Sequence, residues 1–222
     1  EQLGQVMQDA SQVMGQKVAI YGNDACLMAM VEVATEMKDS VGVFLGSQEI
    51  EPGEGWPYST FMKAWAAKPQ MSAIEVGQLL SKEYLKAYSG GIYSDQQVTF
   101  SVYDMAKIEP LLQSISTLNN ELLKADKATI DKVEVAGQGT ESYTNSDYKD
   151  LFHFTQRIQK LAPSVSTNVL TDVRSAISQF VVANDVSEDF ENSHGVSIWL
   201  PTYDTFYHEH KERYRGLVFD QI

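Results

Sequence analysis

Apolar positions near the start of the chain alternate between helical spacing and short continuous runs. Residues 1–14 and 27–37 have apolar side chains at helical spacing, and residues 18–21 and 41–45 are short, nearly uninterrupted apolar runs. Runs of this length are typical of strands that a parallel sheet buries on both faces. These segments therefore predict a strand–helix–strand unit. Cys26 lies at the carboxyl end of its first strand, where we expect the helix to begin.

The rest of the chain continues to interleave helical and strand patterns. The predicted elements are a loop at 46–58, helices at about 59–67, 72–88, 106–124, 147–161, 168–184 and 203–219, and strands at 98–103 and 196–200. Helices and strands in this order predict an α/β protein. We expect two parts: residues 1–104, and a mostly helical part over 105–222 that returns one strand (about 195–200) to the core.

The predicted sheet lacks neighbours for its first strand. A strand as apolar as residues 18–21 needs a partner on each side, and little sequence precedes it to supply one. The architecture therefore looks incomplete.

Composition and charge narrow the function classes. The 222 residues are 43% hydrophobic, and the formal net charge is −13. Nucleic acids and anionic membranes need basic side chains to displace counterions, so this charge argues against both. No apolar run reaches the length of about 18 residues expected of a membrane span. An acidic surface would attract basic peptides, although it can equally serve solubility.

Cys26 is the single cysteine of the chain, so no disulfide forms within it. A lone cysteine is most often a small buried apolar residue. At a helix start the dipole would favour the thiolate, and free backbone N–H groups would suit an oxyanion. Position alone therefore leaves both a packed and a catalytic cysteine open.

The residues around Cys26 resemble the clostripain family of caspase-like cysteine peptidases. The matching segments are Asn23-Asp24-Ala25-Cys26-Leu27-Met28-Ala29, Glu32-Val33-Ala34, Gly46-Ser47-Gln48-Glu49, Glu51-Pro52-Gly53 and Gly55-Trp56-Pro57-Tyr58, with a looser match at Ser193-His194-Gly195-Val196-Ser197-Ile198. The close match covers about the first sixty residues. It implies a caspase-like sheet flanked by helices, and the chain resembles the Cys-bearing heavy chain of such an enzyme.

The resemblance implies a role for each of these residues. Cys26 would be the nucleophile, and Asp24 would bind a basic P1 side chain, the residue after which the substrate is cut. A carboxylate pairs well with guanidinium or ammonium groups, but Asp24 is also well placed to cap the expected helix. Glu49, Glu51 and Glu54, on the loop that edges the substrate cleft in caspase-like folds, would add negative potential, and Trp56 would form a pocket wall. An acidic solvated loop and an ordinary packed tryptophan are the alternatives.

A catalytic dyad also needs a histidine, which in this family precedes the cysteine within a His-Gly pair. Residues 1–25 contain none, and the histidines are at 153, 194, 208 and 210. His194-Gly195 follows the nucleophile and begins a predicted strand, so it opposes the family order. The i, i+2 pair His208 and His210 points to different sides of a helix. We therefore expect the catalytic histidine on a separate N-terminal light chain of the same precursor, produced by autoproteolysis.

The sequence thus predicts a cysteine endopeptidase that cleaves after Arg or Lys through a Cys/His dyad. A catalytically inactive caspase-like binding module and a hydrolase of non-peptide amides are the alternatives. The family implies a secreted or cell-envelope location and, in some relatives, calcium. Oxygen ligands occur at 145–147 and 185–189, although without the spacing of an EF-hand.

Overall fold

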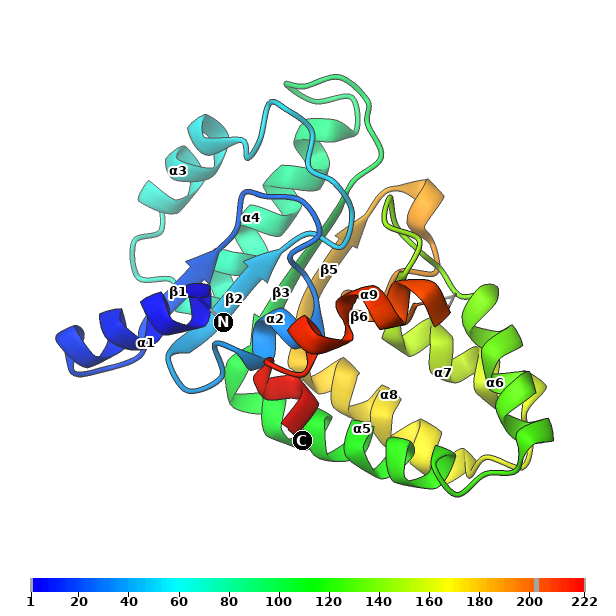
Figure 1. The fold of residues 1–222 in the computed structure, drawn as a ribbon. Coiled ribbons are helices and arrows are strands. Elements are labelled where there is room, and N and C mark those ends of the chain that lie inside the picture. Colours follow the sequence, from blue (N-terminus) through cyan, green and yellow to red (C-terminus); the bar gives the residue numbers. More distant parts are fainter. Residues whose placement is uncertain (1, 202–203, 222) are drawn as a thin grey trace.

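A mixed four-stranded sheet forms the centre of the protein (Figure 1). The computed structural model describes residues 2–201 and 204–221. The strands are β1 (Val18–Gly22), β2 (Val41–Gly46), β3 (Thr99–Asp104) and β5 (Val181–Val186), side by side in the order β1-β2-β3-β5. β1 and β2 are parallel, whereas β2–β3 and β3–β5 are antiparallel. This confirms the predicted α/β class with a sheet flanked by helices.

Both faces of the sheet are covered, which explains the continuous apolar runs in its central strands. β2 reads VGVFLG and β3 reads TFSVYD, and nearly all of these side chains are buried. Phe44 lies opposite Tyr103 in the register, and their rings stack at a centroid distance of 5.4 Å. β-Branched and aromatic side chains of this kind fit a pleated surface that packs on both sides.

Two groups of helices form the outer layers. On one face lie α3 (Tyr58–Ala66) and α4 (Ala73–Tyr88), and on the other lie α2 (Val31–Thr35), α5 (Ile108–Leu122) and α8 (Thr167–Phe180) (Figure 1). The remaining helices are α1 (Gln2–Met14), α6 (Lys127–Gln138), α7 (Leu151–Leu161) and α9 (Asp204–Tyr214), with 3-10 turns at Met105–Lys107, Glu188–Phe190 and Val218–Gln221.

Side-chain caps fix where several helices begin. Ser72 and Glu75 form a reciprocal capping box at the start of α4. Asp126, Asp150 and Ser166 each accept a backbone N–H in the first turn of α6, α7 and α8. These contacts satisfy backbone donors that have no partner inside the helix.

Two predicted elements in the second half need correction. The helix predicted over 168–184 ends at Phe180, and residues 181–186 are β5. Val181 and Val182 are β-branched, and pairing with β3 along the sheet favours the extended conformation there. The predicted strand at 196–200 is β6 (Ser197–Trp199), which pairs with the short β4 (Tyr148–Asp150) in a separate two-stranded sheet.

Three further predictions concern the C-terminal helix, the division of the chain into two parts and the absence of a membrane-spanning segment. α9 lies within the predicted 203–219 helix, and Tyr203 is outside the described residues. The division into 1–104 and 105–222 stays a prediction. Within the described ranges, no helix combines the length and apolar character needed to cross a bilayer.

Candidate active site

Two loops meet at the carboxyl ends of the parallel strands β1 and β2. Residues 23–30 follow β1, and residues 47–57 follow β2. The N–H of Leu27 donates to the Glu49 carbonyl at 3.1 Å, and the N–H of Ala29 donates to the Ser47 carbonyl at 2.9 Å. In α/β sheets ligands bind at this edge, so the topology alone makes it a candidate site.

Cys26 is exposed and lies in a tight turn rather than at a helix start. Leu27 next to it has a φ of 62°, in the left-handed region that few residues other than glycine adopt. Helix α2 begins only at Val31 and is five residues long, so the predicted helix at 27–37 and its dipole at Cys26 are wrong. The backbone N–H of Glu51 points instead at the Cys26 Sγ, at 3.3 Å.

Asp24 joins the two loops through its carboxylate. Its Oδ2 accepts the Tyr58 hydroxyl at 2.9 Å and the Trp56 backbone N–H at 3.3 Å. No helix follows Asp24 directly, so it does not act as the helix cap considered from sequence. Gly55 has a φ of 65°, and a Cβ there would lie 3.0 Å from the Asp24 carboxylate, so glycine permits this close approach.

Glu51 is a second carboxyl group beside Asp24. Both of its carboxyl oxygens are buried and have no hydrogen-bond partner within the described residues. Burial, reinforced by the neighbouring Asp24 carboxyl, raises the pKa of Glu51 to about 9. The same surroundings raise the pKa of Tyr58 to about 12, chiefly through burial and then through its bond to Asp24.

Aromatic side chains line one side of this acidic pair. The Trp56 ring lies 5.4 Å from Phe100 and 6.1 Å from Tyr58 between centroids. Its outer edge rests on Gly22 at the end of β1, where any Cβ would lie 2.6 Å from the ring. Trp56 is thus held in a fixed position next to Asp24, and its role as a wall of the substrate pocket stays a prediction.

Glu49, also predicted to bind substrate, is held within the protein. It is buried, its Oε1 accepts the Ile50 N–H at 2.6 Å, and its Oε2 accepts the Thr144 N–H at 2.9 Å. Its carboxylate ties the loop after β2 to residue 144, and its predicted role in binding stays untested. Glu54 is exposed and accepts a bond from Gln96 at 3.4 Å.

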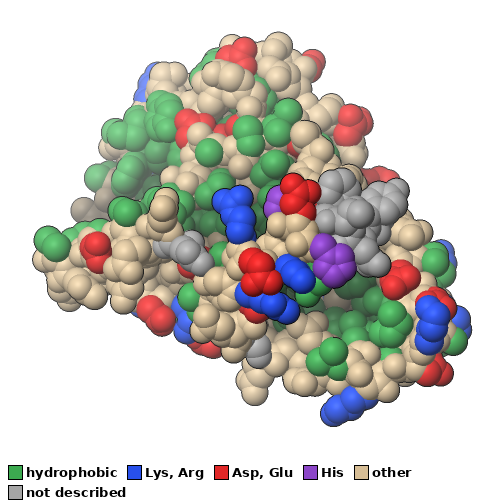
Figure 2. All heavy atoms as spheres, in the orientation of Figure 1, with side chains coloured by type: hydrophobic (Ala, Val, Ile, Leu, Met, Phe, Trp, Pro, Cys, Tyr) green, Lys and Arg blue, Asp and Glu red, His purple; other side chains and the backbone are tan. Residues whose placement is uncertain are grey.

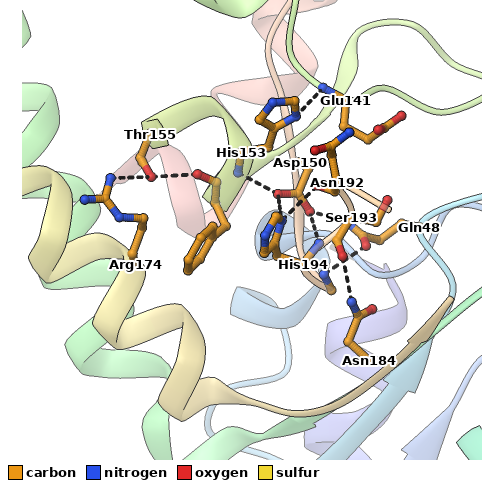
Figure 3. Close-up of polar contacts among 12 residues, drawn as sticks. Gln48, Glu141, Asp150, His153, Thr155, Arg174, Asn184, Asn192, Ser193 and His194 are labelled. Carbon is orange, nitrogen blue, oxygen red and sulfur yellow. Dashed lines mark hydrogen bonds and ion pairs between the residues drawn. The ribbon is translucent and has the colours of Figure 1, made fainter. Parts of the chain in front are cut away.

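A buried network centred on Asp150 supports the loop after β2 (Figure 3). The Asp150 carboxylate accepts the backbone N–H of His194 at 2.6 Å, that of His153 at 2.8 Å, and the Gln48 amide at 3.1 Å. The Oε1 of Gln48 in turn accepts the Gly195 N–H at 3.0 Å. Because Ser47 and Glu49 flank Gln48 and bond to the Cys26 turn, the network also positions that turn.

His194 belongs to this network and does not contact Cys26. Its Nδ1 lies 3.2 Å from Asp150 Oδ1 and 2.8 Å from the Asn192 carbonyl, and its ring stacks on Phe152 at 4.2 Å. Burial is the largest single influence and lowers the pKa of His194, but the hydrogen bond and charge of Asp150 together with the Asn192 carbonyl outweigh it and raise the pKa overall. Among residues 2–201 and 204–221, Cys26 hydrogen bonds only with Glu51 and with no histidine.

The oxygen ligands suggested for calcium are engaged elsewhere. Asn145 Oδ1 accepts the Asp147 N–H, and Asp185 accepts the Ser81 hydroxyl. The part of the chain that the structure describes holds no group of three or more His, Cys, Asp or Glu arranged for a metal ion. These residues therefore do not fit a calcium site as they stand.

Comparisons with known proteins point to one family. The sequence matches the Clostripain family over residues 2–221, whereas no curated protein matches it significantly. A solved clostripain from Bacteroides thetaiotaomicron, in complex with the peptide inhibitor BTN-VLTK-AOMK, has a TM-score of 0.74 at 15% identity, over 98% of this chain and 90% of that chain.

Two further structures have the same fold. A secreted cysteine protease from Bacteroides thetaiotaomicron has a TM-score of 0.72 at 15% identity, over 94% of this chain and 56% of that chain. An inactive protease zymogen from Parabacteroides distasonis has a TM-score of 0.67 at 16% identity, over 97% of this chain and 61% of that chain.

Proposed function

This chain belongs to the clostripain family, and on that premise we propose that it is the Cys-bearing chain of an endopeptidase that cleaves after Arg or Lys. The observation that carries the proposal is the exposed Cys26 thiol beside a carboxylate pair, Asp24 and Glu51, that has no basic partner among the described residues. An exposed nucleophile next to an uncompensated acidic pocket suits a substrate with a basic side chain.

Cys26 is the nucleophile in this mechanism. The thiolate attacks the carbonyl carbon of the P1 residue, and the Cys26 proton passes to a histidine base. The tetrahedral intermediate then expels the amine of the next residue, which takes that proton, and leaves a thioester. Water attacks the thioester, releases the acid and restores the thiol. Backbone N–H groups, that of Cys26 among them, stabilise the oxyanion.

Asp24 and its surroundings form the proposed P1 pocket. Oδ2 of Asp24 is held by the Tyr58 hydroxyl and the Trp56 N–H, so Oδ1 can face a ligand. Guanidinium and ammonium groups bond strongly to carboxylates in a partly dry site. The similar clostripain was solved with an inhibitor whose sequence, VLTK, ends in lysine, and this also favours a basic P1 residue.

We place the histidine on a separate light chain of the same precursor. In support, β1 is an edge strand of the sheet over the described residues, so its outer side can accept another strand. The neighbouring α1 exposes Val6, Val13 and Met14. In Figure 2, apolar side chains gather on the side of the molecule where α1, β1 and α3 lie. A light chain docked there would reach the carboxyl end of β1.

Processing and location follow from the same proposal. One structural neighbour is an inactive zymogen and another is secreted. An enzyme specific for Arg or Lys can cut its own precursor after such a residue. We therefore propose a secreted or cell-envelope bacterial enzyme that matures by autoproteolysis.

The test is covalent labelling of the protein expressed from its full-length gene. Peptidyl chloromethyl ketones ending in Arg, Lys or norleucine are compared, and labelled chains are identified by intact-mass and peptide-mass spectrometry. The proposal predicts a label on Cys26 with the two basic reagents and little with norleucine, together with a second chain containing His-Gly. Equal labelling by all three reagents would contradict the specificity. No labelling or turnover would favour the inactive binding module.

A further inference from the structure

Unsatisfied polar atoms from two segments, the loop after β2 and helix α4, lie near Asp24. They are both carboxyl oxygens of Glu51, the indole Nε1 of Trp56 and the hydroxyl of Tyr84, all buried and without a hydrogen-bond partner in the described residues. Tyr84 comes from α4 and is fully buried. Buried polar groups are normally hydrogen-bonded because an unpaired one is costly, so four such atoms in one place indicate a site that a ligand completes.

These groups face a common space. Burial is the main cause that raises the pKa of the Tyr84 hydroxyl, and Glu51, Tyr88, Asp24 and Cys26 lie close enough to raise it further when they ionise. Three segments thus point polar atoms at the pair of carboxyls: the Cys26 turn, the loop after β2 and helix α4.

The two carboxyls of the pair differ in their hydrogen bonds. Asp24 accepts two close donors at Oδ2, whereas Glu51 has only the Trp56 indole and the Asp24 carboxyl near it and accepts no hydrogen bond of good geometry. The titratable groups that face Glu51 are Asp24, Cys26, Tyr58, Tyr84 and Tyr88, and none of them is a cation at neutral pH. Without a cation beside the two carboxyls, the exposed Asp24 carboxylate disfavours a second negative charge next to it, and the proton stays on the less exposed Glu51.

We propose that Glu51 exchanges a proton for the substrate: it is neutral while the pocket is empty and ionises when a guanidinium or ammonium group enters beside Asp24. The inference rests on the proposed function, because it concerns how that pocket takes its basic side chain.

The charge balance of the pocket explains the exchange. The empty pocket carries a single negative charge, on Asp24. A cation entering beside a neutral Glu51 would cancel that charge and leave the Glu51 oxygens without a strong partner. When Glu51 ionises, two carboxylates surround one cation, and the single net negative charge is retained. A neutral P1 side chain cannot drive this ionisation, so the exchange adds to specificity.

Calorimetry on the two-chain protein from the full-length gene tests the proposal. The probe is a peptidyl-agmatine, which carries the guanidinium side chain but no carbonyl for Cys26 to attack. Binding at pH 7 is measured in phosphate and in Tris, whose ionisation enthalpies differ, and the difference in binding enthalpy gives the protons released. We expect about one proton released by the wild type and close to none by Glu51→Gln.

Glu54→Gln is the matched control, because it removes the same charge from an exposed position of the same loop. It should release as many protons as the wild type. Binding by the wild type without proton release, or equal release by Glu51→Gln, would overturn the proposal. If Glu51→Gln does not fold, the pH dependence of peptidyl-agmatine binding to the wild type is the test. The Kd should rise about tenfold for each pH unit from pH 8 down to pH 6. A Kd that does not change with pH would refute the exchange.

The outcomes separate this inference from the proposed function. Cleavage after Arg or Lys without proton release refutes the exchange and leaves the peptidase assignment standing. Failure of the peptidyl-agmatine to bind, together with no cleavage after basic residues, refutes both.

Discussion

At the residue scale, Asp24 is oriented before any substrate arrives. The Tyr58 hydroxyl and the Trp56 N–H hold one carboxylate oxygen, and Gly55 packs against the carboxylate where no larger residue would fit. A carboxylate fixed in this way loses little rotamer freedom on binding, so more of its attraction for a cation appears as affinity.

Replacing Asp24 by Asn should therefore remove specificity more than reactivity. We expect kcat/KM for an Arg substrate to fall by about 100-fold to 1,000-fold, the effect of removing one partner of a charge pair that the bound substrate shields from water. Alkylation of Cys26 by iodoacetamide should change by no more than about twofold. Asp172→Asn, at an exposed position on α8, is the control. An unchanged preference for Arg over norleucine would exclude Asp24 from the pocket.

Glu32 is a second residue whose protonation matters, here for stability. It is fully buried, and its Oε1 accepts the Trp199 N–H and the Tyr214 hydroxyl, which ties α2 to β6 and α9. Burial raises the pKa of Glu32 from 4.5 to about 7. The folded state therefore holds a proton that the unfolded state has lost between these values, and this contribution to stability falls as pH rises from 4.5 to 7.

Glu32→Gln keeps the acceptor oxygen and removes the charge. Relative to wild type, the variant should gain stability between pH 5 and pH 8, by up to about 3 kcal/mol in the free energy of unfolding. Chemical denaturation at both pH values measures this, with the exposed Glu134→Gln as control. If the difference in the free energy of unfolding between wild type and Glu32→Gln is the same at pH 5 and pH 8, the protonation of Glu32 in the folded state is contradicted.

The sequence singled out Cys26 and Asp24 as candidate site residues because a continuous motif carries them. It did not separate Glu49 from Glu51 on the following loop. Both are glutamates two positions apart in one short loop, so the local sequence does not tell them apart. Contacts with distant residues do: Glu49 accepts the Thr144 N–H and holds the loop, whereas Glu51 lies near Tyr84 in the pocket.

At the element scale, α4 packs against the sheet through a glycine. A Cβ at Gly77 would lie 2.7 Å from the Val102 side chain and 2.8 Å from that of Leu45. The helix can therefore approach β2 and β3 closely, and this places Tyr84, two turns further along, beside the pocket.

Gly77→Ala should lower stability by about 1–2 kcal/mol, since overpacking outweighs the gain in helix propensity. Gly53→Ala is the control because a Cβ there meets no atom within 4 Å. Thermal unfolding of both variants checks the prediction. A more stable Gly77→Ala would show that α4 lies further from the sheet than described.

Strands β1 and β2 and most of the longer helices were predictable because their apolar patterns are strong. β5 and the short α2 were not. β5 continues the helical pattern of α8 but pairs with β3, and α2 is shortened because residues 27–30 bond to the loop after β2 and, at Met30, bridge to Ser197. In both places a tertiary contact outweighs the local preference.

At the scale of the whole molecule, one flank of the sheet is open. β1 has a partner on one side among the described residues, and the α1 side chains next to it are exposed, with Val13 at 89%. The proposed light chain would cover this flank and complete the site.

Val13→Glu should weaken retention of the light chain without lowering the stability of the heavy chain. Leu123→Glu, at a position 84% exposed on the far side of the sheet from α4, is the control. Size-exclusion chromatography of the processed protein, followed by denaturing electrophoresis, measures the ratio of the two chains. Equal ratios for both variants would place the light chain elsewhere.

The central claim, cleavage after basic residues by Cys26, is tested most directly by identifying cleavage sites. The processed protein is incubated with an unfolded protein substrate, and the new termini are sequenced by mass spectrometry, with Cys26→Ala as control. We predict that nearly every cut follows Arg or Lys and that Cys26→Ala makes none. Cuts after other residues, or cuts that persist in Cys26→Ala, would contradict the account.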